Sequence, residues 1–403
     1  MARPKMPIGV QTFEKIVKDD WAYVDKTAVM HELANDTTVN FLSRPRRFGK
    51  SLMLTTLKSY FEGRDDLFKG LAAEKLEPSK ENGGWQEHVV FHFDFNAGNY
   101  KSNGIAELHT RIRCVLKPIE TKWEISVDSD DTYSGRFANA IKVAAEKSGR
   151  NVVILIDEYD KPLLQPIESG LDEPTALKDE LRGFYSVLKS SDQYIRFAML
   201  TGVTKFSKLS IFSDLNQLRD ISFDKKYAAI CGITQEELET NFAPEIETLA
   251  EENSLTYAET LQKLKDTYDG YDFTGAGRKV YNPFSTINVM ADSKFKNYWF
   301  QSGTPTMLIR EIVNTNFDVP DLENDVSETE DAIMNYRPGS DDIVPLLFQT
   351  GYLTIKSVSP VTNFFTLGFP NNEVRHGFYS ALVRYFTDAD YKIEQVYDDK
   401  KDF

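Results

Sequence analysis

Residues 39–51 restrict the fold of this chain more than any other segment. They pass from a short apolar run into a basic loop, after which Gly49-Lys50-Ser51 opens a segment whose apolar residues follow one helical face. The order strand, loop, Gly-Lys-Ser and helix is that of a phosphate-binding loop, the Walker A motif. Backbone N–H groups at the start of such a helix, together with the helix dipole, favour an anion. The segment therefore predicts a phosphate-binding turn.

The side chains of this loop suggest how phosphates and a metal ion are held. Lys50 is expected to place its charge on the β and γ phosphates, and the Ser51 hydroxyl to ligate Mg²⁺. We therefore expect ATP and Mg²⁺ as ligands, although no base-specific motif excludes GTP. The residues predicted to bind the nucleotide in this loop are Arg44, Arg46, Arg47, Phe48, Gly49, Lys50, Ser51 and Leu52.

The loop departs from the usual pattern G-x-x-x-x-G-K-[ST], because Arg44 occupies the position of the first glycine. Glycine there lets the backbone turn tightly and approach phosphate closely, whereas the Cβ of arginine restricts that approach. Two interpretations compete. Either Arg44, Arg46 and Arg47 replace the lost backbone contacts with charge-assisted hydrogen bonds to phosphate, or the loop is a degenerate relic.

A second segment, residues 151–160, supplies carboxylates. Its apolar residues are consecutive and mostly β-branched, which predicts a central parallel strand buried on both faces. Asp157 and Glu158 follow at the carboxyl end, where open α/β sheets bind ligands, as in a Walker B motif. We expect Asp157 to hold the Mg²⁺ shell and Glu158 to polarise the attacking water. The alternative is a buried strand that runs into an acidic, solvated turn, but the preceding Gly-Lys-Ser loop favours a joint nucleotide site.

These and further segments resemble the AAA-ATPase-like family of bacterial and archaeal proteins, predicted P-loop ATPases that commonly carry a C-terminal PD-(D/E)XK nuclease-like domain. Arginine-rich loops without the first glycine are typical of this family, which favours the compensating role of the arginines. The matching segments occur in family order and cover nearly the whole chain: Tyr23-Val24-Asp25-Lys26-Thr27, residues 44–51, Asp157-Glu158-Tyr159-Asp160-Lys161-Pro162, Thr201-Gly202-Val203-Thr204-Lys205-Phe206-Ser207 and Tyr281-Asn282-Pro283-Phe284.

The resemblance implies an α/β fold with a three-layer α/β/α parallel sheet, followed by a helical lid and a winged-helix-like module. A capping box at Thr234-Gln235-Glu236-Glu237 begins a helical region in which strand patterns cease. Farther on, a helix leads into two short strand patterns within residues 352–370. We therefore expect a P-loop NTPase α/β domain at 1–224, a helical lid at 225–315, and a winged-helix-like module with a C-terminal tail at 316–403.

The resemblance also implies roles for residues outside the two motifs. Thr201, at the tip of a strand at 195–202, is expected to orient water and sense the γ-phosphate, so the predicted catalytic residues are Glu158, Lys50 and Thr201. Pro283 either packs on adenine or simply starts a helix. Residues 1–36 either line an adenine pocket or form a packing helix. One cation in the stretch after Thr201 is expected to contact the phosphates. The candidates are Lys205, Lys208 and Arg219, and Lys205 is favoured because it is nearest to Thr201.

A strand at 88–95 places His92 and Asp94 on one side and aromatic residues on the other. The two polar residues are either a catalytic pair or polar groups satisfied by their surroundings, and the second interpretation is favoured.

Composition limits the remaining classes of function. The length of 403 residues suggests two or three domains, and the formal charge of −15 argues against general nucleic-acid binding. Cys114 and Cys231 lie far apart without metal-ligand neighbours, which argues against a disulfide scaffold or zinc site. The chain has no apolar signal core and no run of membrane-spanning length, so we expect a cytoplasmic protein that does not enter membranes.

The sequence thus predicts a Mg²⁺-dependent ATPase with slow hydrolysis that acts as a nucleotide-driven switch. The alternative is a non-hydrolysing sensor or adaptor for a nuclease-like module or another protein partner, and nucleic-acid binding is less favoured. The last third contains no strand with Asp, an apolar residue and Glu-x-Lys, so nuclease chemistry is not assigned to these residues. Either the chain is truncated before a nuclease-like domain or it is a single-module member.

Overall fold

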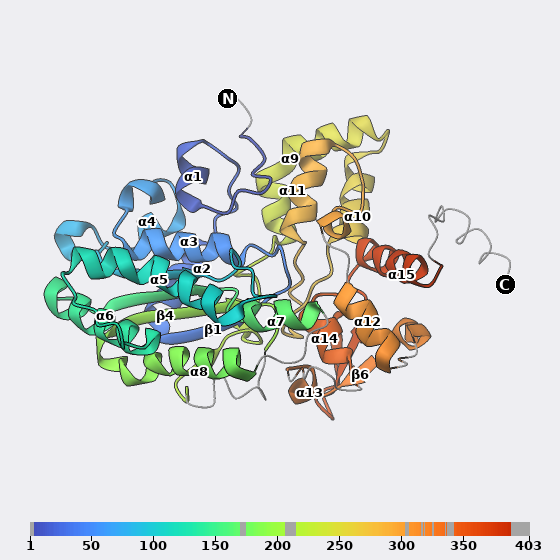
Figure 1. The fold of residues 1–403 in the computed structure, drawn as a ribbon. Helices are drawn as coiled ribbons and strands as arrows, with labels where there is room; N and C mark the ends of the chain where they lie inside the picture. The colour runs from blue at the N-terminus through green and yellow to red at the C-terminus, as the bar shows by residue number, and fades with distance from the viewer. Residues whose placement is uncertain are drawn as a thin grey trace.

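In the computed structural model, a parallel sheet lies between two layers of helices, and further helices with a small antiparallel sheet lie at one end (Figure 1). The structure describes residues 4–169, 175–205, 215–302, 306–315, 317, 319–324, 326–334, 336 and 342–387. Within them, no helix is both long and apolar enough to cross a membrane.

The main sheet has five parallel strands in the order β2-β3-β4-β1-β5. Its central strands form because β-branched and other apolar residues run without interruption, so both faces are buried against helices. The strands are β1 (Val39–Ser43), β2 (Val90–Asp94), β3 (Val152–Asp157), β4 (Ile195–Gly202) and β5 (Arg219–Asp220). Together with a Gly-Lys-Ser turn after β1, this sheet confirms the predicted P-loop α/β fold.

Helices α2 and α3 lie on one side of the sheet in Figure 1, and α6 and α8 lie on the other. The strand alternation in β2 has the predicted result, because Phe91 and Phe93 pack against Phe137 of α6. The helices of this part are α1 (Phe13–Lys18), α2 (Thr27–Asp36), α3 (Lys50–Phe61), α4 (Ala72–Leu76), α5 (Gly104–Lys122), α6 (Tyr133–Ser148), α7 (Lys161–Glu168) and α8 (Thr175–Ser190).

After β5 the described chain contributes no further strand to the parallel sheet. The predicted capping box is present, since the Thr234 hydroxyl accepts from the Glu237 N–H and the Glu237 carboxylate accepts from the Thr234 N–H. Around it, α9, α10 and α11 share a core of their own. The elements are α9 (Gln235–Glu252), α10 (Tyr257–Tyr268), α11 (Pro283–Asp292), α12 (Thr306–Thr315), α13 (Glu330–Met334), α14 (Val344–Gln349) and α15 (Asn372–Thr387).

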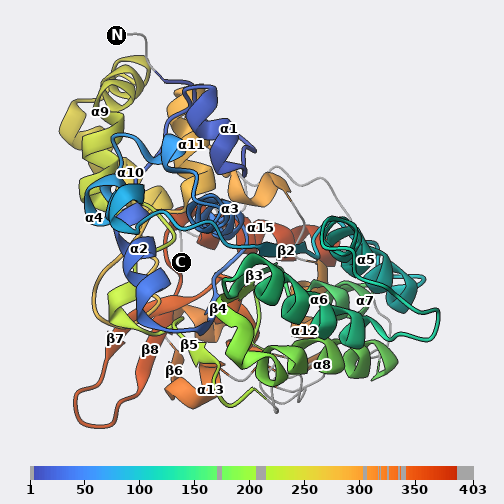
Figure 2. The same cartoon turned by 90° about the vertical axis from the view of Figure 1, so that its left-hand side faces the viewer.

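The small sheet has the order β6-β8-β7 and is antiparallel. Its strands β7 and β8 form a hairpin, visible at the lower left of Figure 2. Buried residues of this sheet and of α14 join the same hydrophobic cluster as the parallel sheet, so the two regions share one core. The strands are β6 (Val326–Glu328), β7 (Thr354–Val358) and β8 (Phe365–Gly368).

Short 3₁₀ helices connect these elements. They span Asp65–Phe68, Lys80–Asn82, Asp192–Tyr194, Lys225–Tyr227, Trp299–Ser302 and Val319–Asn324.

Candidate functional site

The loop between β1 and α3 lies at the carboxyl edge of the parallel sheet, with Lys50 at the first position of the helix. Lys50 is buried, and its ammonium donates to the carbonyl oxygens of Arg44 at 2.8 Å and Pro45 at 3.0 Å. These bonds hold the side chain across the loop and use two of its three N–H donors, so one donor remains for a further acceptor. Gly49 adopts a φ of 90°, which an L residue tolerates poorly.

Ser51 and Leu52 occupy the first turn of α3, where backbone N–H groups have no acceptor within the helix. Both side chains are half-buried. Leu52 packs against the cluster around Phe13 and Phe68, so only its backbone N–H is available to an anion. The predicted loop residues from 49 to 52 therefore offer one ammonium, one hydroxyl and the N–H groups of a helix start.

The side chain of Arg44 is not placed as expected for a residue that binds phosphate. Its guanidinium is buried and donates to the carbonyl oxygens of Ser43 and Ser222 at 2.8 and 2.9 Å, and it lies 4.3 Å from the ring centroid of Phe273. Burial lowers the pKa of Arg44 to about 10. The buried Nε of Arg44 has no hydrogen-bond partner among the described residues. Because its terminal N–H groups are bound to backbone carbonyls and the guanidinium is buried against Phe273, the side chain holds the base of the loop against residues 222–273.

Arg46, Arg47 and Phe48 are also held by later parts of the chain. The Arg46 carbonyl accepts from the indole N–H of Trp299 at 3.4 Å, and the Arg47 guanidinium lies 3.9 Å from the Phe284 ring centroid. Phe48 is buried against Tyr271 and Phe273, with ring centroids 4.7 and 5.3 Å away. Arg46 and Arg47 remain exposed, so of the three arginines only these two present side chains at the surface of the loop.

The predicted carboxylates stand at the same edge of the sheet. Asp157 ends β3, and its Oδ1 accepts a hydrogen bond of 2.7 Å from the hydroxyl of Thr201, which is fully buried near the end of β4. The structure thus brings together Asp157 and Thr201, two residues that the sequence assigned to one site.

Glu158 follows Asp157 with a φ of 50°, a left-handed conformation that non-glycine residues adopt rarely. Burial raises the pKa of the Glu158 carboxyl, and the nearby Lys50 ammonium partly offsets this increase. The basic loop and the acidic strand end meet at one edge of the sheet, because Ser43 pairs with Gly202 and the neighbouring Thr201 donates to Asp157.

Sequence reasoning missed the role of Asp160. Its Oδ2 accepts from the N–H groups of Val203 and Thr204 at 3.0 and 2.8 Å and from the Thr204 hydroxyl at 2.9 Å. Asp160 is buried, and burial raises its pKa. This carboxylate fixes the turn after β4 to the end of β3. The position of Asp160 three residues after Asp157 marked it as part of the motif. Its role was not predictable, because its partners Val203 and Thr204 lie some forty residues away in sequence.

Asp94 lies beside the same edge, because β2 pairs with β3 in a register that sets Asp94 opposite Asp157. Burial raises the pKa of Asp94 and lowers that of His92. The Asp94 carboxylate accepts from the N–H of Asn96, and the buried Nε2 of His92 has no hydrogen-bond partner in the described part of the chain. No hydrogen bond joins His92 to Asp94 there, so the geometry does not form a catalytic pair.

The candidate cations are paired with carboxylates. The Lys205 ammonium lies 2.6 Å from Asp220, and Arg219 contacts Asp36 and Asp224 at 2.8 Å each. Lys208 lies outside the described residues. The charges of Lys205 and Arg219 are therefore neutralised by carboxylates in this structure, so neither residue presents the unbalanced charge beside Thr201 that is expected of the predicted phosphate-sensing cation.

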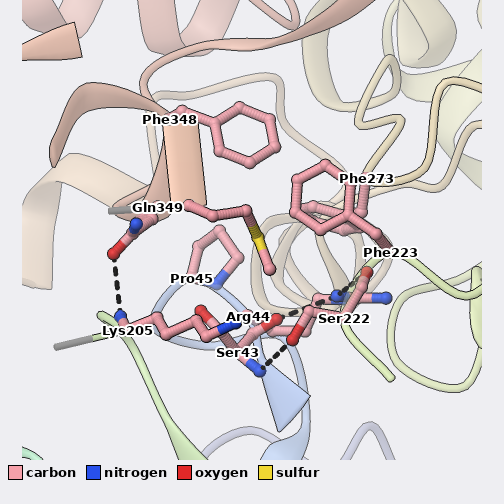
Figure 3. A pocket seen from close by; sticks show the side chains of 10 residues that line it. Ser43, Arg44, Pro45, Lys205, Ser222, Phe223, Phe273, Phe348 and Gln349 are labelled. Carbon is pink, nitrogen blue, oxygen red and sulfur yellow. Dashed lines mark hydrogen bonds between the residues drawn. The ribbon is translucent and has the colours of Figure 1, made fainter. Parts of the chain in front are cut away.

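A narrow gap separates the base of the phosphate loop from α14 (Figure 3). Its volume is about 20 Å³, which leaves room for about one water molecule. The Lys205 N–H donates to the Gln349 side-chain oxygen across it at 2.8 Å. The gap is therefore a packing boundary between two parts of the protein, lined by Arg44, Pro45, Lys205, Phe273, Phe348 and Gln349, among others.

A larger cavity of about 800 Å³ lies between α2 and the segment that leads into α9. Lys26 and Glu237 line it and form an ion pair at 2.5 Å. Among the described residues, none of the phosphate loop at 44–51 lines this cavity, so the cavity is a separate hollow beside α2.

Pro283 does not line this cavity. It is the first residue of α11, and the preceding Asn282 caps the helix by accepting from the Ser285 N–H at 3.1 Å. The helix start alone explains the proline. Its neighbour Phe284 contacts Arg47, so α11 begins beside the phosphate loop.

Residues 7–212 match a family described as predicted AAA-ATPase. The chain is also 38% identical over 387 residues to an uncharacterized protein in the vnfD 5′ region of Azotobacter chroococcum mcd 1. That match covers 95% of this chain and 70% of the relative.

Two solved structures are distantly similar. Cdc6p from Pyrobaculum aerophilum is 9% identical, with a TM-score of 0.31 over 95% of this chain and 94% of that one. The ORC2 protein from Aeropyrum pernix, solved as ADPNP-ADP complexes, is 11% identical, with a TM-score of 0.30 over 89% and 93% of the two chains.

Proposed function

The chain belongs to the predicted AAA-ATPase family, and on this premise we propose that it binds ATP with Mg²⁺ at residues 44–51 and hydrolyses it slowly. One observation carries the proposal: the strand that leads into the loop pairs Leu42 with Thr201, and Thr201 donates to Asp157 at 2.7 Å, so the loop and the carboxylates share one edge of the sheet. A cation, open N–H groups and two carboxylates in one place are the groups that phosphoryl transfer requires.

Lys50 and the N–H groups at the start of α3 bind the phosphates in this proposal. Arg46 and Arg47 add positive charge at the exposed rim of the loop. Arg44 is left out of the phosphate contacts, because its guanidinium is bound to backbone carbonyls.

Ser51 and Asp157 are the residues that would hold Mg²⁺, and their chemistry fits. Mg²⁺ prefers hard oxygen ligands and usually takes only one or two from the protein, with the rest from phosphate and water. The described residues contain no group of three His, Cys, Asp or Glu that could hold a metal by themselves, so a hydroxyl and a carboxylate beside a phosphate suit Mg²⁺ best. Bound there, Mg²⁺ supplies positive charge that neutralises the phosphates.

Glu158 orients and polarises the attacking water, and Thr201 positions Asp157. The hydrogen bond from Thr201 occupies one oxygen of Asp157 and so fixes the direction of the other. Because Thr201 is fully buried, it registers the loss of the γ-phosphate through Asp157 rather than by direct contact.

The cavity of about 800 Å³ between α2 and the segment that leads into α9 is the proposed site of the nucleobase. Its volume is within the range of small-molecule sites. Val29 and Ile230 supply apolar surface and Lys26 with Glu237 supply polar groups, which suits a planar aromatic base.

The output of the site is a nucleotide-driven switch. Phe48, Arg46 and Arg47 touch Tyr271, Trp299 and Phe284 respectively, so a change in the loop reaches a lid at 225–315. In this proposal the nucleotide state also repositions a winged-helix-like module at 316–403. The switched protein then acts on a protein partner, such as a nuclease-like module, in the cytoplasm. The same contacts favour a second candidate, a sensor that binds nucleotide without turnover.

A thermal-shift titration with ATP, ADP and GTP, with and without Mg²⁺, tests binding, because a ligand of the native state raises Tm. We expect a Mg²⁺-dependent rise with ATP. Glu158→Gln is expected to retain this rise and to lose hydrolysis, whereas tight binding without product over hours in the wild type supports the sensor. No shift at millimolar ATP rejects both functions.

A further inference from the structure

Glu373 is a buried carboxylate that the proposed reaction does not use. It lies in the first turn of α15, is fully buried, and accepts hydrogen bonds from two other segments of the chain. The backbone N–H of Trp299 donates to its Oε1 at 2.9 Å, and the hydroxyl of Ser285 donates to its Oε2 at 2.7 Å. Buried carboxylates are retained only where such partners compensate for lost solvation.

Both donors belong to segments that hold the phosphate loop. The indole of Trp299 donates to the carbonyl of Arg46, and Phe284, the residue before Ser285, stacks beneath the guanidinium of Arg47. The Glu373 carboxylate therefore holds two segments, each of which contacts a different residue of the loop, Arg46 or Arg47. A hydrogen-bond pair from α11 and from residues 299–302 converges on α15, although the three segments are far apart in sequence.

The packing around Glu373 allows little adjustment. One turn farther along α15, a Cβ on Gly377 would lie 2.1 Å from the ring of Phe300. The helix is therefore in close contact with the segment that carries Trp299, and a movement of the carboxylate is transmitted to that segment.

Burial raises the pKa of Glu373 to about 7, although the backbone of Trp299, the Ser285 hydroxyl and the backbone of Tyr298 oppose the increase. The titratable groups that face it are the phenols of Tyr268, Tyr271 and Tyr298, whose pKa values burial also raises. A groove beside it carries the charged or titratable side chains of Glu259, Lys263, Asp266 and His376.

We propose that Glu373 is a positioning residue of the nucleotide site, which fixes Arg46 and Arg47 of the phosphate loop through Trp299 and Ser285. This inference rests on the proposed function, since it assigns the loop to nucleotide. Ionised Glu373 offers an acceptor to each donor, whereas the protonated acid keeps one strong acceptor and adds a donor. Protonation therefore loosens one of the two contacts and weakens the loop as a phosphate cradle.

Glu373→Gln tests the proposal, because glutamine has the same shape but one acceptor oxygen and no charge. MgATP dissociation constants are measured from pH 6 to pH 8 for wild type and variant. We expect the wild type to bind about tenfold more tightly than E373Q at pH 8, the effect of one hydrogen bond to a charged group, and the two to converge at pH 6. The γ-phosphate of ATP titrates in the same pH range. The comparison therefore uses the ratio of the two dissociation constants, wild type to E373Q, at each pH, in which the effect of the γ-phosphate cancels.

Glu323→Gln is the matched control, because Glu323 contacts α15 through Arg375 and Tyr379 at the surface but neither loop contact. It is expected to keep wild-type affinity and pH dependence. Equal affinities and equal pH profiles for wild type and E373Q overturn the proposal.

Amide hydrogen exchange of residues 44–51 in the nucleotide-free proteins separates this inference from the proposed function. E373Q is expected to exchange faster there than wild type and E323Q, even if the wild type binds no MgATP. Unchanged exchange overturns the positioning role. If E373Q does not fold, Ser285→Ala removes one donor and is expected to give a smaller change of the same sign, with wild-type behaviour counting against the proposal.

Discussion

Thr201 donates its hydroxyl hydrogen to Asp157 across the two central strands, with 2.7 Å between the oxygens. The bond exists because β3 and β4 pair in parallel, with Ile156 opposite Leu200, so the next residues of both strands reach the carboxyl edge together. Both side chains are buried, and the bond fixes the Asp157 carboxylate before any ligand is present. Rigidity of this kind spares a site the cost of ordering its groups during a reaction.

Thr201→Val removes this hydrogen bond and keeps the shape of the side chain. A buried carboxylate that loses a partner costs about 1 to 3 kcal/mol, so we expect a stability loss of that size. ATP turnover is expected to fall about tenfold or more, with nucleotide affinity changed much less. Urea unfolding and a steady-state ATPase assay measure the two effects, and turnover at the wild-type rate contradicts the positioning of Asp157 by Thr201.

Lys50→Met removes the ammonium that binds two loop carbonyls. We expect the rise of Tm with MgATP to disappear, because the charge on the β and γ phosphates is lost. The control is Lys58→Met on the same helix. The Lys58 ammonium pairs with Glu62 at the surface, so this variant is expected to keep the ATP response. An undiminished ATP response in Lys50→Met places the nucleotide elsewhere.

Arg44→Leu is expected to destabilise the protein although its position in the motif suggests a phosphate contact. Removal of the guanidinium leaves buried carbonyls without donors at Ser43 and Ser222, at a cost of about 2 to 4 kcal/mol. The exposed Arg46→Leu is expected to change stability by less than about 1 kcal/mol. Urea denaturation of the two variants compares them, and equal stabilities disprove the structural role of Arg44.

The pKa of Glu373 makes stability depend on pH. Its pKa rises from 4.5 to about 7 on folding, so the folded state binds the proton more tightly than the unfolded chain. The stabilising contribution is present below pH 4.5 and is lost as pH rises through 7, by up to about 3 kcal/mol. E373Q lacks this loss, and its stability relative to wild type is expected to increase from pH 5 to pH 8 in urea titrations. A constant difference refutes the expectation.

Gly202→Ala probes the contact between the ends of β3 and β4. A Cβ there would lie 2.5 Å from the Tyr159 ring and 2.9 Å from the Asp160 carboxylate, so we expect a loss of about 1 to 3 kcal/mol. Gly183→Ala in α8 is the control, since its Cβ would meet only Ser134 at 3.4 Å and alanine favours a helix by about 1 kcal/mol. Thermal unfolding ranks the two variants, and an equal response contradicts tight packing at Gly202.

Much of the fold was predictable because its signals are local. Residues 39–51 and 152–158 carry their strand, turn and carboxylate patterns within a few positions, and Thr234 carries its capping partner three residues away. The parallel α/β/α sheet followed from these segments and the family resemblance, whereas the strand order β2-β3-β4-β1-β5 came from the structure. Arg44 was interpreted differently because its identity as a cation was visible but its burial was not.

The sequence by itself determined the phosphate-loop pattern, the apolar strand with its terminal carboxylates, and the helix that begins at the Thr234 capping box, because each depends on neighbouring residues. The tertiary structure decided which distant groups meet: Asp160 with Thr204, Trp299 with Arg46, and Glu373 with Ser285. Such contacts join segments separated by tens to hundreds of residues, and their hydrogen bonds form only when burial of the shared core brings those segments together.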